Sequence, residues 1–101
     1  MIVIHASLLI DPANTDAAIA AAQAMMVESR KEPGCDAYTF ARDLSEPGRF
    51  WILEEWENDE ALAIHFKAPH MAKFQQAMGG FAVKEMKAER FVVSSKGPLR
   101  P

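Results

Sequence analysis

The sequence predicts an α+β fold, a four-stranded antiparallel sheet with helices on one face in the ferredoxin-like order β-α-β-β-(αα)-β. Four segments rich in β-branched and aromatic residues are the candidate strands, and helical segments separate the first from the second and the third from the fourth. Only the turn 45–48 joins the second and third strands, which makes them an antiparallel hairpin. Right-handed crossovers then bring both helical segments to one face of a single domain.

The first half of the chain contains a strand and a long helix. Residues 2–10 (IVIHASLLI) predict the strand. Asn14 or Thr15 is the expected cap of the helix, which runs to about Lys31 and is ended by the Glu-Pro-Gly segment 32–34. Its inward stripe is predicted from steps of three and four residues: Ile19, Ala22, Met26 and Ser29.

The hairpin strands are predicted at residues 35–43 and 49–57. Asn58 or Asp59 then caps a helix. This helix should stop near Lys67, because the residue before a proline is pushed out of the helical region.

The last part of the chain holds a second short helix and the fourth strand. Pro69 suits the first turn of a new helix, which we expect to reach about Met78. Residues 86–94 predict the fourth strand. We therefore expect one domain over residues 1–95 and an extended tail over residues 96–101.

Composition excludes several classes of protein. Fourteen acidic and eleven basic side chains give a net charge of −3 with both signs scattered, so no basic tract is available to bind nucleic acid. The most apolar segment, 17–27, is too short to span a membrane, and residues 1–5 lack the basic start of a secretion signal. The single cysteine, Cys35, favours a reducing, cytoplasmic setting and is expected to pack as a small apolar residue.

The strands are apolar on both faces. In a sheet with one solvent-exposed face, apolar and polar residues should instead alternate along each strand. Residues 2–10 and 49–57 each put large apolar side chains on both sides, and the helices can cover one side only. The remaining face therefore predicts a homodimer. In the first strand the side chains concerned are Ile2, Ile4, Leu8 and Ile10 on one face and Val3 and Leu9 on the other. In the third strand they are Phe50, Ile52 and Trp56 on one face and Trp51 and Leu53 on the other.

Three histidines are the main candidates for chemistry. His65 lies on the inward stripe of its helix and is either a buried, hydrogen-bonded histidine or a general base at the edge of a pocket. His70 follows the break at Pro69, a kink that would let both imidazoles border one cavity. The sequence leaves undecided which face of the sheet His5 lies on.

No metal site is expected, because the histidines lack a carboxylate at the spacing of three or four residues that local metal motifs use. Glu54 and Glu55 are neighbours on a strand and point to opposite faces, so they cannot act as a carboxylate pair. We expect both to form ion pairs in the hairpin.

Together these residues resemble a known family. Residues 54–58 (EEWEN), followed by 63–71 (AIHFKAPHM), are similar to the signature of antibiotic biosynthesis monooxygenase domains, and most similar to the quinol monooxygenase-like members. The segment 33–35 (PGC) and the last strand over 86–93 also fit. The resemblance covers nearly the whole chain, but its motifs identify the family better than the substrate.

The resemblance implies a dimeric α/β barrel, made by two ferredoxin-like sheets packed face to face, and cofactor-independent oxygenation of a small aromatic phenol or quinol by dioxygen. In this interpretation His65 is the catalytic base or orienting group, and the cavity between sheet and helices holds the substrate. The expected substrate contacts are Trp56, His70, Phe66, Tyr38 and Arg90, of which Tyr38 and Arg90 are chosen for their chemistry rather than from the family.

Other functions on the same scaffold remain open. Haem-degrading relatives use an Asn on the first strand, a Trp where this chain has His65, and an iron-binding His near the position of Gln75, so haem degradation does not fit. An isomerase of a bacterial signalling molecule shares a similar A-x-H-x-x-x-P-H stretch and stays an alternative. So does a non-catalytic ligand-binding or stress-response protein.

Overall fold

The computed structural model describes residues 1–100, and within them the chain forms the predicted α+β fold. Each expected strand and helix is present close to its expected bounds. The elements are β1 (Ile2–Ile10), a short 3-10 turn (Pro12–Asn14), α1 (Thr15–Ser29), β2 (Cys35–Arg42), β3 (Arg49–Trp56), α2 (Asp59–Phe66), α3 (Pro69–Met78) and β4 (Val83–Val92).

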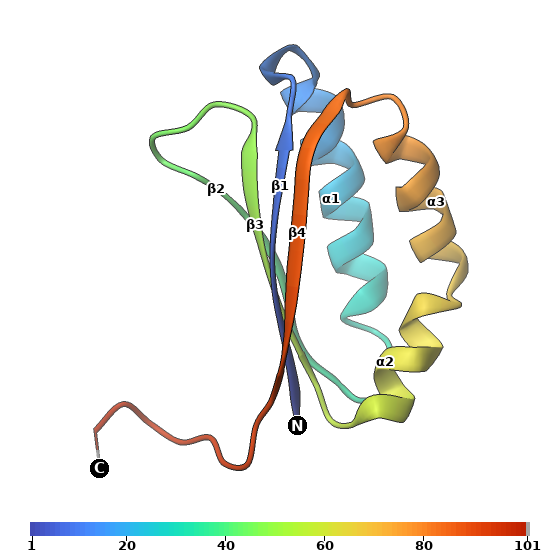
Figure 1. Ribbon diagram of the computed structural model, residues 1–101. Coiled ribbons are helices and arrows are strands. Elements are labelled where there is room, and N and C mark those ends of the chain that lie inside the picture. The colour runs from blue at the N-terminus through green and yellow to red at the C-terminus, as the bar shows by residue number, and fades with distance from the viewer. Residues whose placement is uncertain (101) are drawn as a thin grey trace.

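The four strands form one sheet in the order β2-β3-β1-β4, and every neighbouring pair is antiparallel. Viewed along the edge of the sheet, the three α-helices lie together on one side (Figure 1). The chain beyond β4 leaves on the other side (Figure 1). The fold is therefore the ferredoxin-like arrangement that the order of elements predicted.

Local sequence signals set most of the helix ends. The side chain of Asn58 accepts a hydrogen bond from Ala61 N at 2.9 Å and so caps α2 as predicted. Ala68 is extended and Pro69 occupies the first turn of α3, which explains the break between the two short helices. At α1, Asn14 holds the cap position but its side chain makes no cap hydrogen bond, and the helix ends at Ser29 rather than Lys31.

Two details of the prediction were wrong. The fully buried residues of α1 are Ala18, Ala22, Met25 and Ser29, so the inward stripe is turned slightly from the expected one. Alanine occurs on every side of this helix, so its buried and exposed positions differ little in hydrophobicity. In addition, β4 begins at Val83 rather than residue 86, because Phe81 is buried in the core and the next residues pair with the end of β1.

The core lies between the sheet and the helices as two clusters. Both clusters contain residues of the sheet and of the helices, and they lie at opposite ends of the layer between them. Their buried members are Ile2, Met25, Tyr38, Trp56, Ala61, Leu62 and Phe74 in the first, and Leu8, Ile10, Ala18, Phe50 and Phe81 in the second.

The opposite face of the sheet carries large apolar side chains with no helix over them. Trp51, Leu53 and Phe91 are 38%, 43% and 47% exposed, and His5 stacks on Trp51 with ring centroids 5.4 Å apart. We call this surface the open face. It bears the second set of apolar residues from which the sequence predicted a dimer. Among residues 1–100, no helix has the length and hydropathy needed to cross a membrane.

Of the expected tail, residues 96–100 are described and Pro101 lies outside the described part of the chain. Lys96 Nζ pairs with the Glu55 carboxylate at 2.9 Å, which ties the start of the tail to β3. The division into a domain and a tail stays a prediction.

Candidate functional site

A cavity of about 200 Å³ lies between the helix-covered face of the sheet and the helices α2 and α3. Its walls are mostly apolar, with Tyr38, Phe40, Phe66 and Phe74 supplying aromatic rings. Glu54 and Arg90 are the charged residues that lie on this face of the sheet beside it. We call this space the sheet cavity.

Glu54 is the buried acid of the sheet cavity, with only 9% of the residue exposed. Its Oε1 accepts a hydrogen bond from Trp56 Nε1 at 2.9 Å. Burial raises the pKa of the Glu54 carboxyl, and the Trp56 hydrogen bond and nearby His65 oppose this only in part. The expectation of an ion pair for Glu54 was wrong, because strand alternation turns it into the core while Glu55 faces outward to Lys96.

Tyr38 and Arg90, the two residues chosen for their chemistry, both border the sheet cavity. Tyr38 is 3% exposed, and burial raises the pKa of its phenol well above the ordinary value. Arg90 on β4 and Glu54 on β3 pair with the same β1 residue, Ile4, from opposite sides. Arg90 also forms an ion pair with Asp59 in the first turn of α2, so its charge lies at the rim of the cavity.

Of the remaining predicted contacts, Phe66 borders the sheet cavity and Trp56 does not. Trp56 is completely buried behind it, where its indole packs edge-on against Tyr38 with ring centroids 6.3 Å apart. It reaches the cavity only through its hydrogen bond to Glu54.

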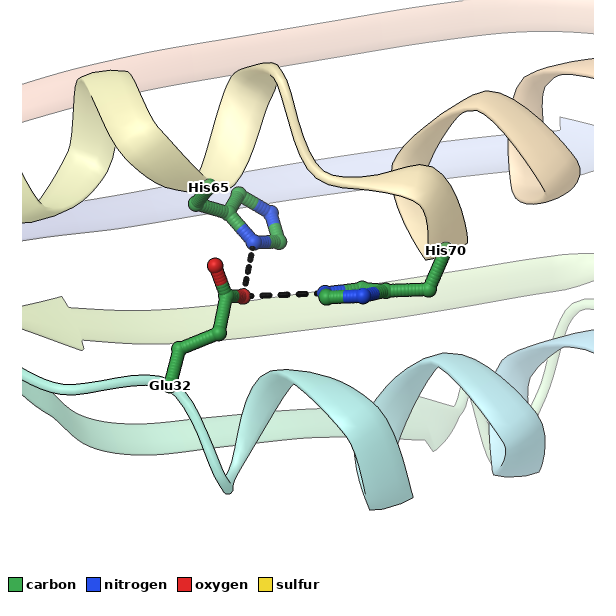
Figure 2. Close-up of side chains that lie close together, drawn as sticks. All are labelled: Glu32, His65 and His70. Atoms are coloured by element: carbon green, nitrogen blue, oxygen red, sulfur yellow. Dashed lines mark hydrogen bonds and ion pairs between the residues drawn. The ribbon is translucent and has the colours of Figure 1, made fainter.

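His65 is also completely buried and is not in the wall of the sheet cavity. Its Nδ1 lies 2.6 Å from Glu32 Oε2, and its ring packs on Trp56 with centroids 4.6 Å apart. His70 Nε2 lies 3.0 Å from the same carboxylate oxygen. Figure 2 shows both imidazoles directed at Glu32, and we call these three residues the Glu-His-His cluster.

The backbone around the Glu-His-His cluster explains how it forms. Glu32 follows α1 in a loop that docks on α2 at Gly34, where a Cβ would lie 2.6 Å from Ala61 Cβ. Gly34 has a φ of +83°, which glycine adopts without strain. The break at Pro69 turns His70 toward the same loop, so the expected convergence of the two histidines does occur, around a carboxylate rather than around the sheet cavity.

Sequence reasoning missed Glu32 because it is 33 residues from His65, and only local spacings were considered. The segment 32–34 was interpreted only as the end of a helix. The local spacings that predicted no metal site leave out this partner, because the structure brings a carboxylate to both histidines from a distant part of the chain.

Two other candidates lie elsewhere. His5 is on the open face, away from the sheet cavity. Cys35 is partly buried, and burial together with the nearby Glu32 carboxylate raises the pKa of its thiol to about 11. The thiol is therefore protonated near neutral pH and is a poor nucleophile.

Known proteins are similar to this chain in sequence and in fold. The uncharacterized protein sll1783 of Synechocystis is 36% identical over 73 residues, which cover 72% of this chain but only 50% of that protein. The Bacillus subtilis protein YcnE, provisionally named a monooxygenase, is 28% identical over 74 residues, covering 73% of this chain and 78% of YcnE. This chain thus matches about half the length of the first relative.

A solved structure from Bacteroides thetaiotaomicron, a conserved protein of unknown function, has 33% sequence identity and a TM-score of 0.82. The match covers 89% of this chain and 94% of that one. Residues 1–77 match the sequence model described as antibiotic biosynthesis monooxygenase, a range that includes the whole Glu-His-His cluster and all of the sheet cavity except its β4 wall and Met78. The chain therefore belongs to the antibiotic biosynthesis monooxygenase family.

Proposed function

We propose that this protein is an oxygenase that binds a small phenol or quinol in the sheet cavity and oxidises it with dioxygen, without a cofactor. The observation that carries the proposal is a buried carboxyl group, that of Glu54, in an otherwise apolar aromatic-lined cavity. Family membership supports the oxygenase class.

The cavity limits the ligand to a small, flat and mostly apolar molecule. Its volume of about 200 Å³ lies below the range of about 300 to 1,000 Å³ typical of ligand pockets, so a molecule of one or two rings is the largest that fits without movement. The rings of Tyr38, Phe40 and Phe74 favour an aromatic ligand through offset or edge-on packing.

Glu54 is suited to remove the phenolic proton. Its Oε1 is held by Trp56, and Oε2 has no hydrogen-bond donor among residues 1–100. A carboxylate whose pKa is raised by burial is a stronger base than an exposed one, so it accepts a proton more readily. This proposal moves the role of base from His65, which lies behind the cavity wall, to Glu54.

The chemistry then needs only the substrate and dioxygen. The phenolate passes one electron to dioxygen, and the resulting radical and superoxide combine at a ring carbon to form a carbon–oxygen bond. Glu54 returns its proton to this peroxide, and loss of water then breaks the oxygen–oxygen bond and leaves a quinone. One phenol and one dioxygen thus give one quinone and one water. The guanidinium of Arg90 at the rim stabilises the anionic stages.

His65 and Trp56 act in this proposal as positioning residues. Glu32 holds the His65 ring, which packs on both Trp56 and Tyr38. Trp56 in turn holds the Glu54 carboxylate. The buried contacts therefore fix the direction of the proton acceptor from behind the cavity.

We also propose that the protein forms a homodimer through the open face. Trp51, Leu53 and Phe91 would lose their water contact there, and burial of apolar area is the main driving force of such association.

The test is oxygen uptake by purified, chelator-treated protein with a panel of reduced naphthoquinols, after subtraction of the rate in buffer. We expect enzyme-dependent uptake that falls by about 100-fold or more in Glu54→Gln, the range for loss of a general base. Glu55→Gln is the matched control, since this neighbour points to the other face and should keep wild-type uptake.

Uptake no faster than buffer with every quinol would overturn the oxygenase proposal. If the same quinols nevertheless bind, as measured by quenching of tryptophan fluorescence, the non-catalytic ligand-binding function is the better description. Equal uptake by wild type and Glu54→Gln would leave an oxygenase but reject Glu54 as its base.

A further inference from the structure

We propose that the Glu-His-His cluster binds one divalent transition-metal ion of the zinc class, at a site separate from the sheet cavity. One ligand atom each from Glu32, His65 and His70 lies within 4.8 Å of the other two. None of these three residues borders the sheet cavity, although Glu32 and His65 also support Trp56 behind it.

The donor set matches the chemistry of such ions. Two imidazole nitrogens and one carboxylate oxygen are the protein ligands of many zinc sites that keep a fourth position open for water. Alkaline-earth ions prefer oxygen ligands only, so the two imidazoles select against calcium and magnesium.

Burial supplies a second, independent reason to expect a ligand. His65 is completely buried and the Glu32 side chain is 10% exposed. Within residues 1–100, Glu32 Oε1 is buried with no hydrogen-bond partner. A buried carboxylate oxygen without a partner is costly, and a cation beside the Glu32 carboxylate would offset that cost.

The distances require only a small rearrangement. Bond lengths of about 2.0 Å in a tetrahedral site separate neighbouring ligand atoms by about 3.3 Å. Glu32 Oε2 is now 2.6 Å from His65 Nδ1 and 3.0 Å from His70 Nε2, so each of these two pairs must open by less than 1 Å. The two imidazole nitrogens lie within 4.8 Å of each other and must approach by at most about 1.5 Å. The His70 side chain is 18% exposed and follows the break at Pro69, so it can move without disturbing a helix interior.

A groove adjoins the site at His70. This groove of about 550 Å³ runs between α1 and α3, and His70 is part of its wall. Glu28 and Lys73 also border this groove, so its charge is balanced and a cation meets no net repulsion. The open fourth position of the ion would face this groove and hold water.

The experiment uses the full chain without an affinity tag, treated with chelator and desalted. Zinc is titrated by calorimetry and cobalt by visible absorption, because tetrahedral cobalt(II) has a characteristic visible spectrum. We expect one ion per chain and the tetrahedral spectrum in wild type. His70→Ala and Glu32→Gln should each weaken binding by at least about 100-fold, more than loss of an outer-shell partner costs.

His5→Ala is the matched control, since it also removes one histidine but from the open face. It should bind zinc and cobalt as wild type does. Thermal unfolding gives a second measurement: zinc should raise the Tm of wild type and His5→Ala but not that of His70→Ala.

Absence of saturable binding in wild type, or unchanged affinity in His70→Ala, would overturn the proposal. Loss of binding in His5→Ala would also overturn it, because the ion would then bind elsewhere. These outcomes do not involve oxygen uptake, so failure of the metal site and failure of the oxygenase proposal are distinguishable.

Discussion

The contact between Gly34 and α2 allows a quantitative prediction about how the Glu-His-His cluster is held. In Gly34→Ala, the new residue must keep a φ of +83°, which costs about 1 to 2 kcal/mol for a residue with a Cβ. The new Cβ would also lie 2.6 Å from Ala61 Cβ, and crowding of this kind costs about 1 to 3 kcal/mol.

The lower conformational entropy of the unfolded alanine variant offsets about 0.4 to 1 kcal/mol of this destabilisation. The free energy of unfolding should therefore fall by about 1 to 5 kcal/mol in total. Denaturant unfolding at fixed protein concentration measures this change. Gly97→Ala is the control, because a Cβ at Gly97 would meet nothing within 4 Å, and it should alter stability by less than about 0.5 kcal/mol.

A double-mutant cycle with Ala61→Gly separates the two costs. Removal of the Ala61 methyl relieves the clash but not the backbone strain, so we expect a coupling free energy of about 1 to 3 kcal/mol between the two substitutions. Additive effects of Gly34→Ala and Ala61→Gly, or an unchanged stability in Gly34→Ala, would refute this account of the loop.

Three other predictions follow from burial and exposure. Because burial raises the pKa of Glu54 above its ordinary 4.5, the folded state binds more protons than the unfolded state there, and wild-type stability should fall as pH rises above about 4.5. Glu54→Gln should remove this fall in denaturant unfolding measured at several pH values, whereas Glu55→Gln should not. Wild type should sediment at about twice the 11.2 kDa chain mass, and Leu53→Glu on the open face should give monomers while Val27→Glu, an exposed position of α1, keeps the dimer. With a thiol pKa near 11, Cys35 should react with iodoacetamide much more slowly at pH 8 in folded than in denatured protein, and equal rates would contradict the pKa shift.

Much of the fold could be predicted because its signals are local. Asn58 caps α2 and Pro69 starts α3, each through the conformation of the residue itself and its nearest neighbours. The inward face of α1 was less predictable, since a helix made mostly of alanine contains little information about which side is buried.

The candidate site was likewise predictable only in part. Tyr38, Phe66 and Arg90, which were predicted as substrate contacts, border the sheet cavity, because strand alternation and helix periodicity set which way they face. The buried state of Glu54 was not predicted, since alternation shows that it and Glu55 face opposite ways but not which of them enters the core.

By itself, the sequence determined the order of strands and helices, the break between α2 and α3, and the family. These depend on backbone preferences and patterns that extend over a few residues. Only the tertiary structure decided that Glu54 is the acid of the cavity and that Glu32 joins His65 and His70. Such contacts depend on how distant segments dock, and docking is set by the packing of the whole core rather than by any local spacing.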